Sequence, residues 1–183
     1  ALSKYLGECL VLHWSKVYKM NNVSLRLFNA YGPRSRTNSN YGAMFGVFLT
    51  QKLKNKQLTI VGNGKQTRDF LFISDLVRAI YKSYKHGKSG EIYNVSSGKE
   101  ISINKIAKLL NHPVVFIPKR PGEPDRLRGD IKKTKITFRW KPEISINRGV
   151  KIMLDNIKDW ESAPVWTRSK IKSATTDWFK YLK

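Results

Sequence analysis

The sequence predicts an α/β fold, in which part of a Rossmann-type parallel sheet is joined to a smaller α/β lobe. Residues 2–20 carry apolar side chains at helical spacing, and the strand-like segment 23–28 follows them, as in half of a βαβ unit. A second β-rich segment at 91–95 is expected to belong to the same, mostly parallel sheet. The first strand ends at Asn29 and a Gly-Pro turn, and open parallel sheets bind ligands beyond the carboxyl ends of their strands.

The remaining helices and strands follow from the same signals. Residues 43–54 place Phe45, Phe48, Leu49 and Leu53 on one helical face, and short apolar runs bounded by turn residues predict strands. The predicted helices are 2–20, 43–54, 75–84, 102–110, 131–138 and 145–157, and the predicted strands are 23–28, 58–61, 68–73, 91–95 and 114–117.

Helix starts and the tail can also be predicted. Ser74, Ser102, Asp130 and Ser145 each precede a helical segment and are the residue types that cap helix N-termini. The tail at 160–183 is rich in aromatic side chains, so we expect it to pack against the rest of the chain.

Composition limits the class of protein. The 183 residues are 40% hydrophobic, enough for a globular core, and no apolar run reaches the roughly 20 residues that span a bilayer. The single cysteine, Cys9, and the lack of a signal-peptide pattern favour a cytoplasmic location without disulfides. The chain begins inside a helical pattern without Met, which we interpret as the start of a fragment.

The formal net charge of +22 is compatible with a nucleic acid partner, an anionic small molecule or a lysine-rich surface. The lysines are dispersed along the chain, and no zinc-finger, leucine-zipper or RNA-binding signature is present. Nucleic acid is therefore not the expected partner.

Two arginines are candidates for anion binding. Arg68 follows the loop GNGKQT, Arg120 follows PVVFIPK, and each lies near a carboxylate, Asp69 and Glu123 respectively. Two guanidinium groups from separate loops could clamp a diphosphate, although a structural ion pair is the better explanation of each arginine taken alone. The three histidines are too dispersed for a metal site, and none is predicted.

The segments SKYLGE, RLFNAYGPR, GNGKQTRDFLFISDLVRAIY, GEIYNVSSGKEISI and KRPGEPD occur in this order. Together they resemble the extended short-chain dehydrogenase/reductases of the NAD-dependent epimerase/dehydratase family, which act on nucleotide sugars. The resemblance covers almost the whole chain. It implies NAD as cofactor and a nucleotide-diphosphate sugar as substrate, with transient oxidation at sugar carbon 4.

The family's catalytic motif is Tyr-x-x-x-Lys, and the resemblance implies that Lys4 is the motif lysine. This lysine hydrogen-bonds the nicotinamide ribose and lowers the pKa of the tyrosine, which would lie one position before Ala1. The further residues implied are Phe28 and Tyr31 beside the nicotinamide, and Asn29, Phe48, Val61, Arg68, Arg120 and Glu123 around the nucleotide sugar. Asp69 and Asp75 are assigned structural roles, as a strand-end partner and a helix cap.

The resemblance also divides the chain, taken as a single unit over 1–183. It assigns 1–34 and 74–96 to the cofactor fold, 35–73 and 97–145 to the substrate-binding lobe, and 146–183 to C-terminal helices.

The family's Gly-rich NAD loop does not occur in the sequence. We therefore expect the chain alone to bind a nucleotide sugar without turning it over, and to self-associate as a homo-oligomer. Two alternatives remain: a non-catalytic nucleotide-sugar-binding module, and, less favoured, a basic nucleic-acid-binding domain.

Overall fold

The computed structural model describes residues 2–35, 37 and 44–181, and these residues form two compact units. The first unit consists of residues 1–30, 69–99 and 128–144, and the second consists of 31–68, 100–127 and 145–183. Both units are therefore built from three separate stretches of the chain.

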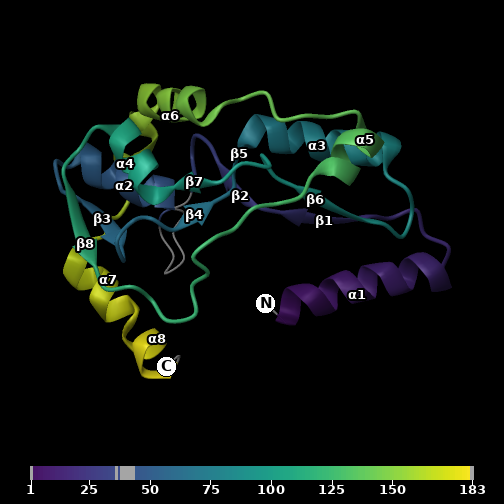
Figure 1. Cartoon of the computed structure of the whole chain (residues 1–183), viewed down its shortest axis with the longest axis horizontal. Coiled ribbons are helices and arrows are strands. Elements are labelled where there is room, and N and C mark those ends of the chain that lie inside the picture. Colours follow the sequence, from purple (N-terminus) through teal and green to yellow (C-terminus); the bar gives the residue numbers. More distant parts are fainter. Residues whose placement is uncertain (1, 36, 38–43, 182–183) are drawn as a thin grey trace. The chain divides into compact units, whose positions relative to one another are not determined.

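The first unit is built on a parallel pair of strands. In β1 (Ser24–Leu27) and β6 (Ile92–Val95), Ser24 is paired with Ile92 and Leu27 with Val95. This confirms the two predicted strands and their parallel direction, and it shows that they are direct neighbours. Helices α3 (Ile73–His86) and α5 (Lys132–Phe138) pack against each other, and α5 contacts β6 (Figure 1).

The core of the first unit lies between this strand pair and these helices. Its buried side chains are Leu71, Leu76, Ala79, Tyr93, Val95, Phe138 and Trp140, with Val23 and Leu25 packed against them. Tyr93 and Phe138 are in ring contact, with centroids 4.5 Å apart.

Helix α1 (Leu2–Val17) is shorter than the predicted helix, and its apolar face is not buried. It contacts β1, and Ser15 is its one buried residue among those described. The exposed fractions are 70% for Leu2, 53% for Leu6, 58% for Leu10, 51% for Trp14 and 54% for Val17. These side chains therefore do not pack on the β1–β6 pair, and α1 meets β1 through Glu8, which accepts hydrogen bonds from Ser24 and Arg26.

The segment after β1 also differs from the prediction. Asn29, which was predicted to follow the strand, begins a short strand, β2 (Asn29–Tyr31), which pairs with β5 (Phe70–Phe72). The predicted turn comes after β2, at Pro33 and Arg34. The predicted strand at 68–73 is divided at Asp69, because the backbone oxygen of Asp69 accepts the amide hydrogen of Asn29 while its side chain faces other loops.

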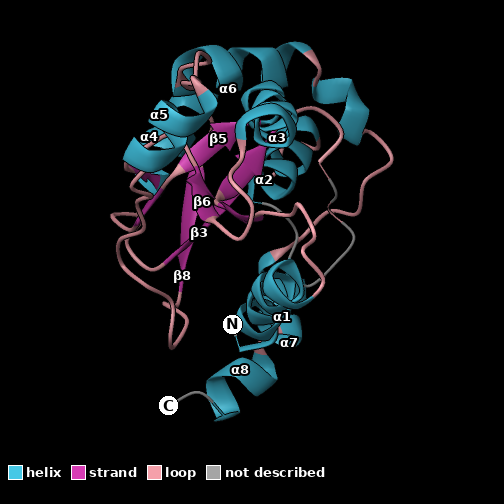
Figure 2. Cartoon of the chain, turned by 90° about the vertical axis from the view of Figure 1, so that its right-hand side faces the viewer, coloured by secondary structure: helices cyan, strands magenta, loops and turns pink. Residues whose placement is uncertain are grey.

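In the second unit, strands β3 (Leu58–Val61) and β8 (Val114–Ile117) form a parallel pair (Figure 2). Strands β4 (Thr67–Arg68) and β7 (Ile101–Ser102) form a short antiparallel pair. The helices of this unit are α2 (Met44–Leu53), α4 (Ile103–Leu110), α6 (Ile146–Asp155), the 3₁₀ helix η1 (Ile157–Trp160), α7 (Arg168–Ala174) and α8 (Thr176–Tyr181).

The tryptophans of the aromatic tail contact the rest of the chain as predicted, whereas Tyr181 is 70% exposed. The indole N–H groups of Trp160, Trp166 and Trp178 donate to the backbone oxygens of Ser35, Thr37 and Pro121, respectively. The predicted helix start at Ala43 and most of the predicted loop at 35–41 lie outside the described residues.

Two of the four predicted caps are confirmed. The hydroxyl oxygens of Ser102 and Ser145 accept the amide hydrogens of Lys105 and Arg148. Ser74 is not a cap, because α3 begins one residue earlier, after Phe72.

Asp130 accepts the amide hydrogen of Lys132, but the N-cap position of α5 is Ile131. Helix α6 ends at Asp155, before the predicted end. No helix in the described part of the chain is long and apolar enough to cross a bilayer.

Candidate functional site

The loop that follows β8 is the centre of the candidate site. It runs from Pro118 to Leu127 and is held by several hydrogen bonds. In the first of these, the amide of Thr67 donates to the backbone oxygen of Asp125 at 2.9 Å. Arg68 donates through Nη1 to the backbone oxygens of Thr67 and Pro124, both at 2.8 Å. The loop is thus held at the β4–β7 pair, and its side chains have defined positions.

Arg126 adds a bidentate ion pair with Glu100, with N–O distances of 3.0 and 2.7 Å. The hydrogen bonds that Arg126 donates to Glu100 raise the pKa of Arg126 above its already high ordinary value. Glu100 also accepts a hydrogen bond from the Thr67 hydroxyl at 3.1 Å, so the same carboxylate joins the loop to β4.

The two arginines singled out in the sequence converge on one carboxylate. Arg120 Nη1 lies 3.2 Å from Glu123 Oε1, and Arg68 Nη2 lies 3.8 Å from Glu123 Oε2. The three side chains are only partly exposed, at 24% for Arg120, 15% for Arg68 and 23% for Glu123. Two cations sharing one carboxylate leave a net positive charge, which suits an anionic ligand.

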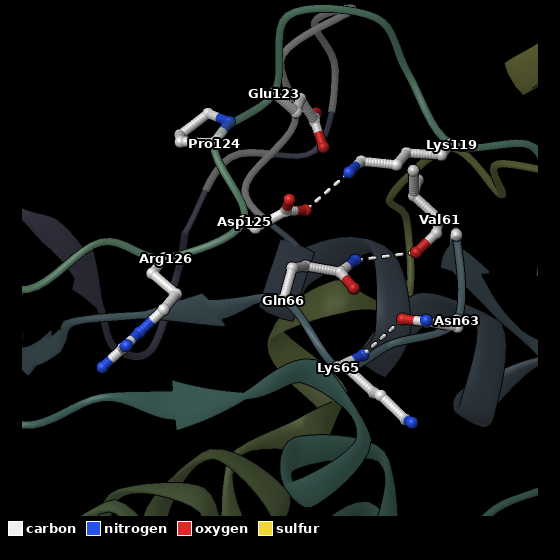
Figure 3. Close-up of a pocket in the computed structure, with 10 residues that line it drawn as sticks. Val61, Asn63, Lys65, Gln66, Lys119, Glu123, Pro124, Asp125 and Arg126 are labelled. Atoms are coloured by element: carbon white, nitrogen blue, oxygen red, sulfur yellow. Dashed lines mark hydrogen bonds and ion pairs between the residues drawn. The ribbon is translucent and has the colours of Figure 1, made fainter.

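A pocket of about 450 Å³ lies beside this loop (Figure 3). It is lined by Val61, Gly62, Asn63, Lys65, Gln66, Lys119, Glu123, Pro124, Asp125 and Arg126. Its size is within the range of small-molecule sites. Both the strand end at Val61 and the loop after β8 contribute to it, so it lies at the carboxyl ends of a parallel strand pair, where α/β sheets bind ligands.

The Gly-Asn-Gly turn that follows β3 forms one wall of this pocket (Figure 3). Gly62 and Gly64 adopt φ values of +64° and +71°, a region that favours glycine. A Cβ atom on Gly64 would lie against the carboxamide of Asn104, so a larger residue is excluded there by space as well. Across the pocket, Lys119 pairs with Asp125 at 2.6 Å.

Arg120 also borders a second pocket of about 410 Å³ in the same unit. Its guanidinium carbon lies 5.4 Å from the ring centroid of Trp178 on α8. Arg168 and Lys172 of α7 line this pocket as well. Arg120 is therefore bordered by an aromatic ring on α8 and by further positive charge on α7.

The structure places four predicted residues, Val61, Arg68, Arg120 and Glu123, on or beside the loop after β8. Phe48 is buried in α2 with 2% exposure. Tyr31 belongs to the second unit too, where it is 3% exposed and stacked on Phe45.

The other predicted residues belong to the first unit. Lys4 is exposed on α1, Asn29 is exposed at the start of β2, and Phe28 is half-buried. Phe28 donates its amide hydrogen to the backbone oxygen of Val95.

Sequence reasoning did not single out Lys119, Arg126, Gln66 or Trp178. Lys119 and Arg126 flank the motif RPGEPD, and that clustering of basic residues was the available signal. The positions of Gln66 and Trp178 depend on long-range contacts and had no local signal. Among the described residues, no cluster of His, Cys, Asp and Glu could hold a metal ion.

Comparison with known proteins identifies relatives of this chain. The model of a family described as "NAD dependent epimerase/dehydratase family" matches residues 1–96. The dTDP-D-glucose 4,6-dehydratase of Bos taurus is 30% identical over 181 residues, which cover 89% of this chain and 49% of that protein.

Solved structures agree. UDP-glucose 4-epimerase from Thermotoga maritima, determined with UDP-glucose, superposes with a TM-score of 0.79 at 27% identity, covering 86% of this chain and 52% of that one. UDP-glucuronic acid 4-epimerase from Bacillus cereus, in complex with UDP-glucuronic acid and NAD, gives 0.75 at 32% identity, covering 83% and 50%. This chain spans between 36% and 52% of the length of the curated relatives that it matches.

Proposed function

Because this chain belongs to the NAD-dependent epimerase/dehydratase family, we propose that it forms the nucleotide-sugar-binding part of such an enzyme. The observation that carries the proposal is the convergence of Arg68 and Arg120 on Glu123 beside the pocket after β3 and β8. Two related structures were solved with UDP-glucose or UDP-glucuronic acid bound, which supports the same ligand class here.

In this proposal the two arginines have different roles. Arg68 donates its Nη1 hydrogens to the backbone oxygens of Thr67 and Pro124, so it holds the loop in place and contributes positive charge. Arg120 makes one ion pair at 3.2 Å and can turn part of its guanidinium toward a diphosphate. Glu123 orients both guanidinium groups and accepts a hydrogen bond from a hydroxyl of the nucleotide's ribose.

The residues proposed for the cofactor fit it only in part. Lys4 is exposed and forms no ion pair within the described chain, so its ammonium group is available to a ribose hydroxyl. The ring of Tyr31 is buried against Phe45 and offers no free face. When bound, NAD supplies a reversible hydride acceptor for the sugar.

The 183 residues contain no Gly-rich dinucleotide loop, so we propose that they bind a nucleotide sugar but do not turn it over by themselves. Release of an altered sugar from UDP-glucose or UDP-glucuronic acid by the purified chain would contradict this part of the proposal.

Arg120→Ala tests the site directly. Loss of a charge-assisted contact with a phosphate is expected to weaken UDP-glucose or UDP-glucuronic acid binding by about tenfold, measured by titration calorimetry. Arg148→Ala is the matched control, because Arg148 is an exposed arginine of the same unit that forms no ion pair with a described residue. Equal affinities of the two variants would remove Arg120 from the site.

A further inference from the structure

The first unit contains a basic pocket that the proposed function does not use. It has a volume of about 690 Å³ and lies between α3 and the end of α5. It is lined by Arg78, Tyr81, Lys82, Lys135, Arg139, Trp140, Lys141 and Glu143. Five of these eight residues are basic, compared with 35 of 183 in the whole chain. Basic residues are therefore more concentrated around this pocket than along the chain as a whole.

One of the five basic residues is already neutralised. Arg78 pairs with Asp75 at 2.8 Å and with Glu143 at 2.5 Å, and it donates to the backbone oxygen of Lys141 at 3.1 Å. The hydrogen bond from Arg78 lowers the pKa of Glu143, which keeps this carboxylate ionised and paired. Arg78 therefore fixes the pocket wall and does not compete for a ligand.

The other four cations have no such partner. Lys82, Lys135, Arg139 and Lys141 form no ion pair with any residue in the described part of the chain. Lys141 is partly compensated, because its charge contributes to the lowered pKa of Glu143. Like charges that line one pocket repel each other, and a ligand with several negative charges would relieve that repulsion.

Aromatic side chains complete the pocket. Tyr81 is 55% exposed, and the Nζ atom of Lys85 lies over its ring, 4.7 Å from the centroid, so a ligand would meet the rest of the ring. Trp140 is buried and held by a hydrogen bond from its Nε1 to the backbone oxygen of Asp75 at 3.1 Å. A rigid buried wall and an exposed ring next to cations suit a ligand with both a phosphate chain and a flat group.

We propose that this pocket binds a small ligand that carries two or more linked phosphate groups. Phosphate oxygens match both the guanidinium group of Arg139 and the ammonium groups of the three lysines. The four cations line a single open pocket of about 690 Å³, a size that suits a small molecule.

The test uses tripolyphosphate as the probe, titrated into the full chain by calorimetry at about 150 mM salt so that distant surface charges are screened. The variant is Lys135→Ala/Arg139→Gly. Arg139 has a φ of +48°, which glycine adopts readily, and alanine is the best helix former, so both changes suit the local backbone.

The matched control is Lys16→Ala/Lys132→Ala, which removes the same charge from exposed helix positions of the same unit outside the pocket. We expect the pocket variant to weaken tripolyphosphate binding by about tenfold or more and the control to change it by less than about twofold. Equal weakening in both variants, or no measurable binding to the unaltered chain, would overturn the proposal.

Two further titrations define the ligand. Tighter binding of ATP than of tripolyphosphate, with the difference lost in Tyr81→Ser, would identify a nucleotide as the ligand, and equal binding would identify the phosphate chain alone. Binding of a single-stranded oligonucleotide that is lost in Lys135→Ala/Arg139→Gly, together with no binding of tripolyphosphate or ATP, would overturn the small-ligand proposal.

Discussion

Asp69 is the residue on which the loops of the first unit depend. Its carboxylate is fully buried and accepts hydrogen bonds from the Ser97 amide at 2.7 Å, the Ser97 hydroxyl at 2.6 Å, the Gly98 amide at 3.0 Å and the Gly129 amide at 3.1 Å. One side chain thus ties the turn after β6 and the segment before α5 to the start of β5. This is a structural role, as expected from the sequence.

Asp69→Asn is expected to destabilise the chain by about 2–3 kcal/mol, because the amide group offers fewer acceptor sites and places two donor hydrogens against buried amides. Urea unfolding monitored by circular dichroism would measure the change. Asp155→Asn, at an exposed position, is the control and should leave the free energy of unfolding within about 0.5 kcal/mol. A loss below about 1 kcal/mol for Asp69→Asn would contradict the role assigned to this carboxylate.

In helix α4, neighbouring residues determine where the helix starts and ends and which face is buried. The Ser102 oxygen accepts the amide hydrogen of Lys105 at 3.2 Å, and the helix ends at Asn111 in the left-handed conformation with a φ of +47°. Ile103, Ile106, Ala107 and Leu110 are buried on one face. Start, end and buried face all have local causes.

Ser102→Ala is expected to cost about 1 kcal/mol, because the Lys105 amide loses its partner, whereas Ser102→Asp should retain the cap. Thermal unfolding of the three proteins would show the difference. If alanine and aspartate shift the melting temperature equally, the cap does not contribute to stability.

An ion pair between Glu8 and Arg26 links α1 to β1. Glu8 accepts two hydrogen bonds from Arg26, at 2.8 and 2.7 Å, and these bonds are the main cause of the lowered pKa of Glu8. Because the pKa is lowered in the folded state, the stabilisation is complete above the ordinary glutamate range and is lost as pH falls through the folded-state value.

Protection of α1 amides from hydrogen exchange should therefore decrease between neutral and acidic pH. In Glu8→Gln this part of the pH dependence should be absent. The effect should be at most about 1 kcal/mol, because Arg26 is 53% exposed. Identical pH profiles of the two proteins would show that the ion pair does not hold α1.

At the scale of the whole molecule, the exposed apolar face of α1 is the main free-energy cost that contacts within the described chain do not offset. Leu6, Leu10 and Trp14 are each more than half exposed, and water contact with such a stripe is unfavourable. This observation supports the expectation that the chain self-associates, which stays a prediction.

Sedimentation velocity over a range of concentrations is expected to show association that Leu10→Lys/Trp14→Lys weakens. Ile136→Lys is the control, because Ile136 is an apolar side chain on α5, outside α1, with 80% exposure. A monomer at all concentrations would contradict the prediction, as would equal weakening by the control.

Much of the fold could be predicted because its causes are local. The strands Leu58–Val61 and Val114–Ile117 were predicted with their observed bounds, and so were the caps Ser102 and Ser145. The split of the predicted strand at Asp69 could not be predicted, because it results from hydrogen bonds to residues far along the chain. For the same reason the exposure of α1 was missed, since an amphipathic pattern shows which face is apolar but not whether anything covers it.

The sequence by itself determined the α/β class, most of the elements, the family and the two arginines, because side-chain periodicity, capping and motif spacing are properties of neighbouring residues. Only the tertiary structure decided that Arg68 and Arg120 meet at Glu123, and that four cations surround one pocket between α3 and α5. These arrangements depend on strand pairing and helix packing between distant segments, which no local pattern encodes.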